Sequence, residues 1–212
     1  MKLIGMLDSP FVRRVAVSLQ LLDLRFEHQS LSVFRHFDAF RALNPVVKVP
    51  TLVCDDGEVL MESTLILAYA ESLAGRSLMP AGGRALQHEL RLIGLALMAC
   101  EKSVQVYYER DRRPPERVYA PWLQRVQGQA VAAYQELEAE LARAPLAATR
   151  ERITQAGIST AVAWGFTQNM LPELVPAGRY PQLAALGVAA EALAEFRAAP
   201  FGEGVVASAQ PA

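Results

Sequence analysis

Hydrophobic and polar positions change period several times within the first eighty residues. The run KLIGML at residues 2–7 is apolar after its lysine and predicts a buried strand. Apolar side chains at positions 11, 12, 15, 19 and 22 then follow the period of a helix. A second strand is predicted over residues 25–33. The chain therefore begins with a β-α-β unit, and short connections of this kind favour parallel strands with a right-handed crossover.

The alternation of strands and helices continues to residue 75. A short, irregular helix is predicted near residues 36–43, because Asn44-Pro45 ends the apolar pattern there. Residues 49–63 carry two strands of β-branched and aliphatic residues around Asp56-Gly57, a strong hairpin signal. Ser63 is expected to cap a helix that ends at Gly75. The predicted order is β-α-β-α-β-β-α.

Beyond Gly82 the pattern is helical throughout. A long amphipathic helix is predicted over residues 85–113, where a pair of prolines ends it. A second long helix is predicted over residues 115–144, with Pro121 as a candidate interruption. Two more helices are predicted further along, at residues 151–171 and 181–200.

Gly, Pro and Ser concentrate at residues 75–84, between the mixed pattern and the helical one. Such a stretch is typical of a domain boundary. We therefore predict an α/β domain over residues 1–77 followed by an all-α domain over residues 84–212.

Composition and charge exclude several classes of partner. The chain has 212 residues, of which 52% are hydrophobic, and a formal net charge of −1, so it has enough apolar residues for one or two compact domains. Its 21 Lys and Arg are interleaved with 22 Asp and Glu, so no nucleic-acid partner is expected. Because no segment approaches the roughly 18 uninterrupted apolar residues of a membrane span, we expect no membrane partner and a cytoplasmic protein.

The cysteines and histidines do not suggest a metal site. Cys54 and Cys100 belong to no C-x-x-C pair, and neither has a metal-ligand spacing with the three histidines, His28, His36 and His88. We expect two reduced thiols and no metal.

Three short motifs carry the candidate chemistry. SPFVRR at residues 9–14 follows the first strand, VVKVPTL at residues 46–52 precedes the hairpin, and MES at residues 61–63 precedes the next helix. With the predicted element order, these motifs resemble the cytosolic glutathione transferase family, in its bacterial, serine-type form with a thioredoxin-like N-terminal domain. Ser9 and Val12 stand where thioredoxin-like redox proteins carry C-x-x-C, which excludes disulfide chemistry by the protein itself.

The resemblance implies that Ser9 is the catalytic residue and that glutathione is the cosubstrate. Ser9 followed by Pro10 also has the form of a helix start, with the serine as N-cap. Its hydroxyl would donate to the sulfur of bound glutathione, and the positive end of the helix would favour thiolate over thiol. The carboxylate of Asp8 would oppose thiolate formation unless it points away.

The resemblance also implies how the rest of glutathione is held. Pro50 is expected to be cis and to present the Val49 backbone to the glutathione peptide, with Phe11 and Lys48 also in the binding site. Ser63 would take the α-carboxylate of the γ-glutamyl group, and Glu62 would face its ammonium. Independently of the family, an N-cap serine before a helix is an anion site, although such a cap often binds nothing.

The electrophile is expected to lie beside the sulfur and against the helical domain. Candidate walls are aromatic or apolar side chains of the helical region, although aromatic residues at helical spacing are more often core residues: Met98, Tyr107, Tyr108, Trp164 and Phe166, with Phe11 from the first domain. Arg13 and Arg14 are expected on the solvent or interdomain side of the first helix, in salt bridges.

The leading hypothesis is therefore an enzyme that activates the glutathione thiolate for attack on a small electrophile. Conjugation, dehalogenation, ether cleavage and peroxidase activity all use that thiolate and stay open. A non-catalytic binding or regulatory protein on the same fold is the alternative. A zeta-type isomerase fits less well, because Asp8-Ser9-Pro10 differs from the Ser-Ser-Cys of that group.

Two further expectations concern assembly and the helical domain. The apolar excess over residues 90–108 and the family resemblance both indicate a symmetric homodimer. At the predicted helix near residue 154, family members usually carry a capping box of Thr or Ser with Asp three residues later. Here Thr154 is followed by Gly157, so the reciprocal hydrogen bond is missing, a loss of about 0.5–2 kcal/mol.

Overall fold

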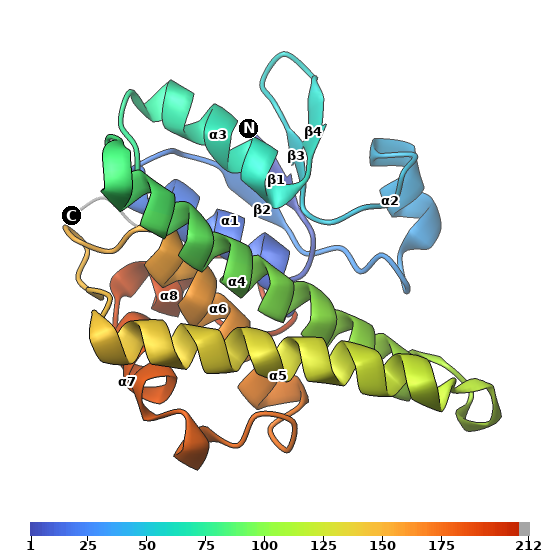
Figure 1. The fold of residues 1–212 in the computed structure, drawn as a ribbon. Helices are drawn as coiled ribbons and strands as arrows, with labels where there is room; N and C mark the ends of the chain where they lie inside the picture. The colour runs from blue at the N-terminus through green and yellow to red at the C-terminus, as the bar shows by residue number, and fades with distance from the viewer. Residues whose placement is uncertain (208–212) are drawn as a thin grey trace. The chain divides into compact units, whose positions relative to one another are not determined.

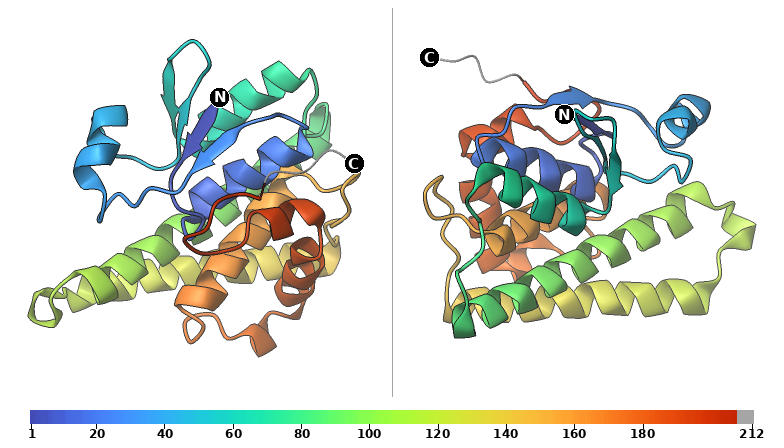
Figure 2. Two further views of the ribbon diagram at one scale, coloured as in Figure 1. Left: turned by 180° about the vertical axis from the view of Figure 1, so that it is seen from behind. Right: turned by 90° about the horizontal axis from the view of Figure 1, so that it is seen from above.

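The structure is a computed structural model, which describes residues 1–207. The chain folds into two compact units, shown in Figures 1 and 2. Unit 1 consists of residues 1–78 together with the chain from Glu191 onward, and unit 2 consists of residues 79–190. Each unit is described by itself.

Unit 1 is built on a four-stranded sheet with the order β2-β1-β3-β4. β1 is parallel to β2 and antiparallel to β3, and β3 pairs antiparallel with β4. These pairings confirm the predicted parallel β-α-β unit and the hairpin at Asp56-Gly57. The strands are shorter than the apolar pattern suggests: β1 (Lys2–Ile4), β2 (Glu27–Gln29), β3 (Thr51–Val53) and β4 (Val59–Met61).

The helices of unit 1 surround a core of aliphatic side chains. α1 and α3 pack against each other beside the sheet, whereas α2 stands apart from both (Figures 1 and 2). Fully buried core residues come from β1, β3 and these two helices: Leu3, Ile4, Val15, Leu19, Leu52 and Ile66. The helices are α1 (Pro10–Leu21), α2 (Phe37–Leu43), α3 (Ser63–Ala74) and the C-terminal α8 (Ala194–Ala198).

The C-terminal segment belongs to unit 1, which differs from the expected helical domain over residues 84–212. Arg13 on α1 binds this segment through several hydrogen bonds. Its guanidinium donates to both carboxylate oxygens of Glu191, at 2.6 and 2.7 Å, and to the carbonyl of Ala199, at 2.8 Å. Arg13 is 2% exposed and Arg14 is 3% exposed, so neither lies on the solvent side, one of the two places expected, and the salt bridge expected for Arg13 is made with Glu191. A buried guanidinium needs such partners, and here the C-terminal segment supplies them to Arg13.

Unit 2 is helical. α4 and α5 form a long pair connected at one end by short turns, as Figures 1 and 2 show, and α6 packs against α4. The elements are α4 (Gly83–Tyr107), the π-helical turn η1 (Tyr108–Arg112), the 3₁₀ turns η2 (Pro115–Arg117) and η3 (Ala177–Arg179), α5 (Ala120–Arg143), α6 (Gln155–Met170) and α7 (Pro181–Glu191). None of the helices described combines the length and hydrophobicity that a bilayer span requires.

Three helix boundaries differ from the sequence prediction. α5 begins at Ala120 rather than at residue 115, because the second proline of the pair, Pro115, begins the short turn η2 instead. Pro121 does not interrupt α5, since it stands in the first turn, where a missing N–H breaks no intrahelical bond. The last predicted helix is two helices, α7 and α8.

The N-terminus of α6 is capped from another helix. Thr154 is the N-cap residue but makes no side-chain cap hydrogen bond, and Gly157 offers none. Instead, the carboxylate of Glu89 on α4 accepts from the Ala156 N–H at 2.7 Å, and Glu89 is only 5% exposed. A tertiary contact therefore replaces the local capping box that the sequence lacks.

Candidate functional site

Ser9 caps α1, as predicted, and leaves the end of the helix open. Its hydroxyl accepts from the Val12 N–H at 3.5 Å, a long hydrogen bond, and Pro10 follows in the first turn. The first turn of α1 holds no acidic residue. Because a hydroxyl can donate and accept at once, the Ser9 O–H can also donate to a ligand. The positive end of α1 and this donor together can stabilise an anion.

Asp8, directly before Ser9, acts electrostatically on Arg35. Glu203 raises the pKa of Arg35, first through a hydrogen bond and then through its charge, and Asp8 adds a smaller attraction. Arg35 also donates to the Met6 sulfur at 3.5 Å, so its guanidinium lies beside the loop that leads to Ser9. The Arg35 cation offsets part of the negative charge that Asp8 brings to this corner.

The segment before β3 is held by a side chain that the sequence pattern did not single out. Asn44, which is buried, accepts from the Val46 N–H at 3.0 Å and donates to the Thr51 hydroxyl at 2.8 Å. The Val49–Pro50 peptide bond is cis, as the resemblance implied. Of the predicted ligand contacts here, Lys48 is exposed, Val49 is half-buried and Pro50 is buried.

The N-terminus of α3 corrects one prediction. Glu62, and not Ser63, is the N-cap residue, with φ at 72°. This backbone turn lets the Glu62 carboxylate reach the free amides of the helix, and it accepts from the Thr64 N–H at 3.1 Å and the Leu65 N–H at 3.2 Å. Ser63 is the first helical residue, and its hydroxyl donates to Glu62 at 3.3 Å.

Arg14 joins α1 to the first turn of α3. Its Nη1 donates to the Ser63 hydroxyl at 3.1 Å and to the Thr64 hydroxyl at 3.2 Å. Because the guanidinium occupies the acceptor side of Ser63, the Ser63 O–H is oriented as a donor. The result is a cation and a carboxylate, Arg14 and Glu62, on either side of one buried hydroxyl.

The structure places all predicted glutathione contacts in unit 1. Phe11 is half-buried in the first turn of α1, beyond Ser9. Ser63 is linked directly to α1 by Arg14. Sequence reasoning missed Arg14, Arg35 and Asn44, although a second arginine on an otherwise apolar helix was a usable signal for Arg14.

Apart from Phe11 in unit 1, the predicted electrophile walls lie in unit 2 and divide into two groups. The rings of Tyr107 and Tyr108 lie 6.0 Å apart at the end of α4, where Tyr108 is 42% exposed, and Met98 is 39% exposed on the same helix. Trp164 is instead buried between the rings of Tyr134 and Tyr180, each with its centroid 6.1 Å away. Trp164 is thus a core residue, which differs from its expected place in a pocket wall, and Phe166 is also buried.

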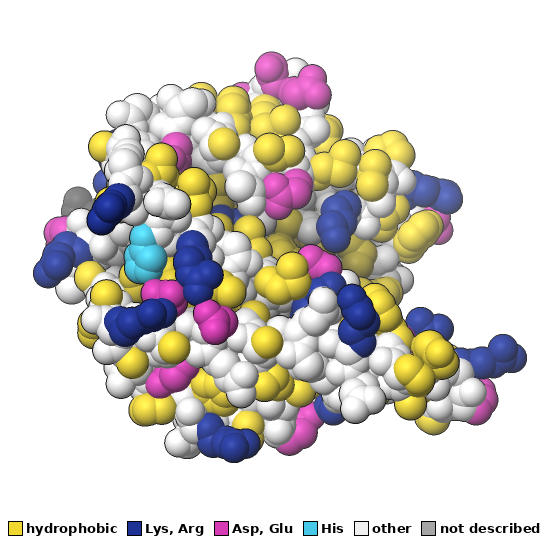
Figure 3. All heavy atoms as spheres, in the orientation of Figure 1, with side chains coloured by type: hydrophobic (Ala, Val, Ile, Leu, Met, Phe, Trp, Pro, Cys, Tyr) yellow, Lys and Arg dark blue, Asp and Glu magenta, His cyan; other side chains and the backbone are white. Residues whose placement is uncertain are grey.

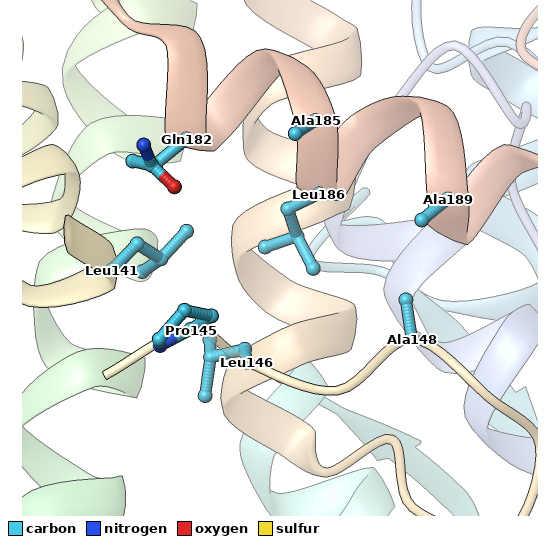
Figure 4. Close-up of a pocket in the computed structure, with 8 residues that line it drawn as sticks. All are labelled: Leu141, Pro145, Leu146, Ala148, Gln182, Ala185, Leu186 and Ala189. Carbon is cyan, nitrogen blue, oxygen red and sulfur yellow. The ribbon is translucent and has the colours of Figure 1, made fainter. Parts of the chain in front are cut away.

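A separate cavity in unit 2 does not suit glutathione. It encloses about 260 Å³ between the end of α5, the loop after it and α7 (Figure 4). Its walls are aliphatic except for one amide: Leu141, Pro145, Leu146, Ala148, Gln182, Ala185, Leu186 and Ala189. The lining holds no charged side chain to balance the carboxylates and ammonium of a tripeptide.

Charge and metal-binding groups are distributed as follows. On the face drawn in Figure 3, Lys and Arg side chains are mixed with Asp and Glu side chains. Among residues 1–207, no group of three or more His, Cys, Asp or Glu side chains is arranged to hold a metal ion. Cys54 and Cys100 are both free thiols and buried.

Sequence comparison matches the N-terminal part of the chain to known proteins. The family model described as glutathione S-transferase, N-terminal domain, matches residues 3–78. The uncharacterized GST-like protein YibF of Escherichia coli strain K12 is 35% identical over 71 residues. That alignment covers 34% of this chain and 35% of YibF, so the matched part is about a third of the curated relative.

Two solved structures resemble nearly the whole chain. A glutathione transferase family member from Pseudomonas fluorescens Pf-5, with bound S-(propanoic acid)-glutathione, is 33% identical, with a TM-score of 0.76. The match covers 94% of this chain and 98% of that one. A glutathione S-transferase from Methylobacterium radiotolerans in complex with glutathione sulfonate is 26% identical, with a TM-score of 0.84, and covers 100% and 96% of the two chains.

Proposed function

The chain belongs to the glutathione S-transferase family, and we propose that it binds glutathione in unit 1 and activates the glutathione thiol for attack on an electrophilic small molecule. The relatives from Pseudomonas fluorescens and Methylobacterium radiotolerans support this proposal, because each was solved with a glutathione derivative.

The arrangement at the start of α3 carries the proposal. The γ-glutamyl end of glutathione is a zwitterion, with a carboxylate and an ammonium on one carbon. Arg14 supplies positive charge beside Ser63, the Ser63 O–H would turn from Glu62 to donate to the ligand carboxylate, and the Glu62 carboxylate matches the ammonium. Although Glu62 already accepts from two backbone amides, a carboxylate has about four acceptor sites, so it can accept from an ammonium as well.

The start of α1 supplies the chemistry. With the γ-glutamyl end at Ser63 and the peptide against Val49, the sulfur comes to Ser9. Its hydroxyl then donates to the sulfur, and the open end of α1 favours the negative charge. Helix N-termini lower thiol pKa values from about 8.5, which raises the fraction of thiolate at neutral pH. The nucleophile belongs to the cosubstrate, and the protein positions it and stabilises its charge.

The residues proposed to contact the electrophile belong to unit 2. Tyr107, Tyr108 and Met98 are its remaining candidates, because they are accessible, whereas Trp164 and Phe166 are in the core. Conjugation, dehalogenation, ether cleavage and peroxide reduction all begin from the same thiolate, and a panel of electrophiles distinguishes them.

We also propose a homodimer. Large apolar side chains are exposed on α4, where Leu90 is 54% exposed, and on α3, where Leu65 is 65% exposed and Leu73 is 48% exposed. Exposed apolar side chains of this size favour burial against a second copy. Sedimentation at micromolar concentration should show twice the mass of the 23.2 kDa chain, and a monomer alone would contradict the dimer. The cytoplasmic location stays a prediction.

Calorimetry tests the binding step directly. Glutathione should bind at millimolar concentration or below, and cysteinylglycine, which lacks the γ-glutamyl group, should bind much more weakly. If glutathione does not bind at millimolar concentration, the enzyme proposal is wrong, and the non-catalytic binding protein on this fold replaces it. If both peptides bind equally, the role of Arg14, Glu62 and Ser63 is wrong.

A further inference from the structure

The C-terminal strap, which we define as residues 199–207, crosses unit 1 and is fixed at several points. It begins at Ala199, whose carbonyl accepts from Arg13 at 2.8 Å. The carbonyl of Glu203 accepts from the Ser30 hydroxyl at 2.7 Å. Near its described end, the Val206 N–H donates to Nδ1 of His28 at 3.0 Å. The strap is thus tied to α1 and to β2 with the residue after it.

His28 connects the strap to the loop that precedes Ser9. Its Nε2 lies 2.7 Å from the carbonyl oxygen of Gly5, and its Nδ1 accepts from the Val206 N–H. A carbonyl can only accept and an amide N–H can only donate. Both contacts are therefore satisfied by one species, the neutral imidazole with its proton on Nε2.

Gly5 lies between the start of α1 at Ser9 and the segment around Val49 that is predicted to bind glutathione. Its φ is 135°, and a Cβ placed on it would lie 2.6 Å from a Val12 side-chain carbon and 2.9 Å from one of Val49. The backbone of Gly5 is thus packed directly between Val12, whose N–H is bonded to Ser9, and Val49. A shift of the Gly5 carbonyl would move both sides of the proposed site.

A second set of contacts joins the strap to the loop between β1 and α1. The Glu203 carboxylate pairs with Arg35 at 2.8 Å, and Arg35 also contacts the Met6 sulfur at 3.5 Å. Arg35 and His28 therefore hold the strap at two points, and both reach the loop between β1 and α1.

Protonation of His28 breaks one of its two contacts. With both ring nitrogens protonated, Nδ1 becomes a donor that faces the Val206 N–H, and the hydrogen bond is lost. Burial lowers the pKa of His28 below its ordinary 6.5, and the Gly5 carbonyl opposes that shift in part. The neutral form therefore predominates at pH 6.5 and above, and the contact is lost as the pH falls through the lower, folded-state pKa.

The charged groups around His28 are already paired with other residues. On β1 and β2, Lys2 pairs with Glu27 at 3.2 Å, and the amino group of Met1 pairs with Asp55. On the strap, Glu203 pairs with Arg35 and is also attracted by His36, a second titratable group. The change of charge at His28 thus acts mainly through its two backbone contacts.

We infer that His28 is a pH-sensitive positioning residue. In its neutral form it links the C-terminal strap to the Gly5 carbonyl, and so keeps Val49 and the start of α1 at Ser9 in position for the ligand. The effect on ligand binding rests on the proposed function, whereas the fastening of the strap does not.

Hydrogen exchange, measured without ligand on the full chain, tests the fastening. Protection is compared with the intrinsic rate at each pH. In the wild type, protection of residues 203–207 should fall about tenfold from pH 7.5 to a lower pH at which NMR shows the His28 ring to be protonated, the effect of one lost hydrogen bond. His28→Gln keeps a donor for the Gly5 carbonyl, has no acceptor at the position of Nδ1 and does not titrate. Its protection should be low and equal at both pH values, whereas His88→Gln, in unit 2, should behave as the wild type.

Binding of S-methylglutathione tests the positioning, because this ligand has no thiol that titrates in the same range. Its affinity for the wild type should fall about fivefold between the same two pH values, the lower end of usual coupling between sites. In His28→Gln, and in a chain truncated after Gly202, the affinity should not depend on pH over this range.

The two measurements separate the possible failures. Strap protection that does not change with pH in the wild type overturns the inference, and so does a His28→Gln variant that keeps the wild-type pH dependence. An affinity that is independent of pH while the strap opens overturns the positioning role. If S-methylglutathione binds at neither pH, the proposed function fails, and the exchange data still decide the fastening. If His28→Gln does not fold, the truncated chain still gives the binding test with His28 intact, and the exchange of the wild type decides the fastening.

Discussion

The N-termini of α1 and α6 both present backbone N–H groups that have no acceptor within the helix, and different groups accept from them. At α1, in unit 1, a serine hydroxyl accepts from the Val12 N–H at 3.5 Å, and the first turn has no acidic residue. At α6, in unit 2, the buried carboxylate of Glu89 accepts from the Ala156 N–H at 2.7 Å. A helix end filled by a carboxylate of the protein is structural, whereas an end closed only by a long hydroxyl contact keeps its positive potential for a ligand.

The N-terminus of α3 lies between these two cases. The Glu62 carboxylate fills part of it, and Arg14 approaches the same turn from α1. A site with both charges suits a zwitterion better than a simple anion. The three helix ends therefore differ in the ligand that each can bind, and substitutions at each of them test these differences.

The largest effect is expected for Ser9→Ala. The variant loses the donor to the sulfur, a charge-assisted hydrogen bond of about 1.5–3 kcal/mol, so turnover with glutathione at neutral pH should fall about ten- to a hundredfold. Because the pKa of bound glutathione should rise, activity should recover in part at higher pH. A pH–rate profile measures both effects.

Thr154→Ala is the matched control for Ser9→Ala. Thr154 is also an N-cap residue but makes no side-chain cap hydrogen bond, so its substitution should leave turnover unchanged. Ser9→Cys should form a mixed disulfide with glutathione, which mass spectrometry detects. An unchanged pH–rate profile in Ser9→Ala, together with no glutathionylation of Ser9→Cys, would show that Ser9 only caps the helix.

Glu62→Gln should weaken glutathione binding about tenfold, as expected for one charged hydrogen bond. The amide keeps the shape of the side chain but removes the charge that faces the ammonium. Calorimetry measures the change, and Glu58→Gln, on the exposed hairpin of the same unit, is the control. Equal affinities for wild type and Glu62→Gln would place the ammonium elsewhere.

Glu89→Gln should lower the free energy of unfolding by about 1–2 kcal/mol, because the α6 terminus loses a charged cap. For a chain of this size that corresponds to a decrease in Tm of roughly 2–4 °C for each kcal/mol. Denaturant unfolding measures it. Glu136→Gln, which only breaks a surface ion pair with Arg91, should cost less. Equal losses in the two variants would mean that Glu89 is not an effective cap.

The smallest effect is expected at Glu140, a carboxylate of unit 2 that pairs with cations instead of a helix end. His88 first, then Arg91 and Arg143, lowers the pKa of Glu140 below its ordinary 4.5. A lowered carboxyl pKa stabilises the fold above pH 4.5, and this contribution is lost as the pH falls through the folded-state value. Glu140→Gln should cost up to about 1 kcal/mol at pH 6 and less at pH 3. Denaturation at both pH values measures the difference, and an equal cost at both would contradict the ionic origin.

Much of unit 1 could be predicted because its signals are local. Ser9-Pro10 marks the start of α1, Asp56-Gly57 marks the hairpin, and Gly75 ends α3 in the left-handed conformation that glycine favours. Each depends on a few neighbouring residues and on backbone preferences that the amino acids carry by themselves. Family resemblance added the cis bond before Pro50, which periodicity alone does not indicate.

Apart from the N-cap of α3, the parts that could not be predicted depend on residues far apart in the chain. Ser63 looked like the N-cap of α3, but the backbone turn at Glu62 gave that place to the preceding residue. Gly157 indicated a missing cap at α6, and Glu89, more than sixty residues earlier, supplies it. Trp164 has the same apolar periodicity in a core as in a pocket wall, and only the packing of Tyr134 and Tyr180 around it decides between them.

The sequence by itself determined the order of the elements, the cap of α1 and the motifs that point to glutathione, because these follow from spacing and local backbone chemistry. The tertiary structure alone decided that Arg14 reaches Ser63, that Arg13 returns the C-terminal segment to unit 1, and that His28 joins this segment to Gly5. The physical reason is that buried polar and charged groups must find partners, and the sequence does not show which distant group the fold will bring to them.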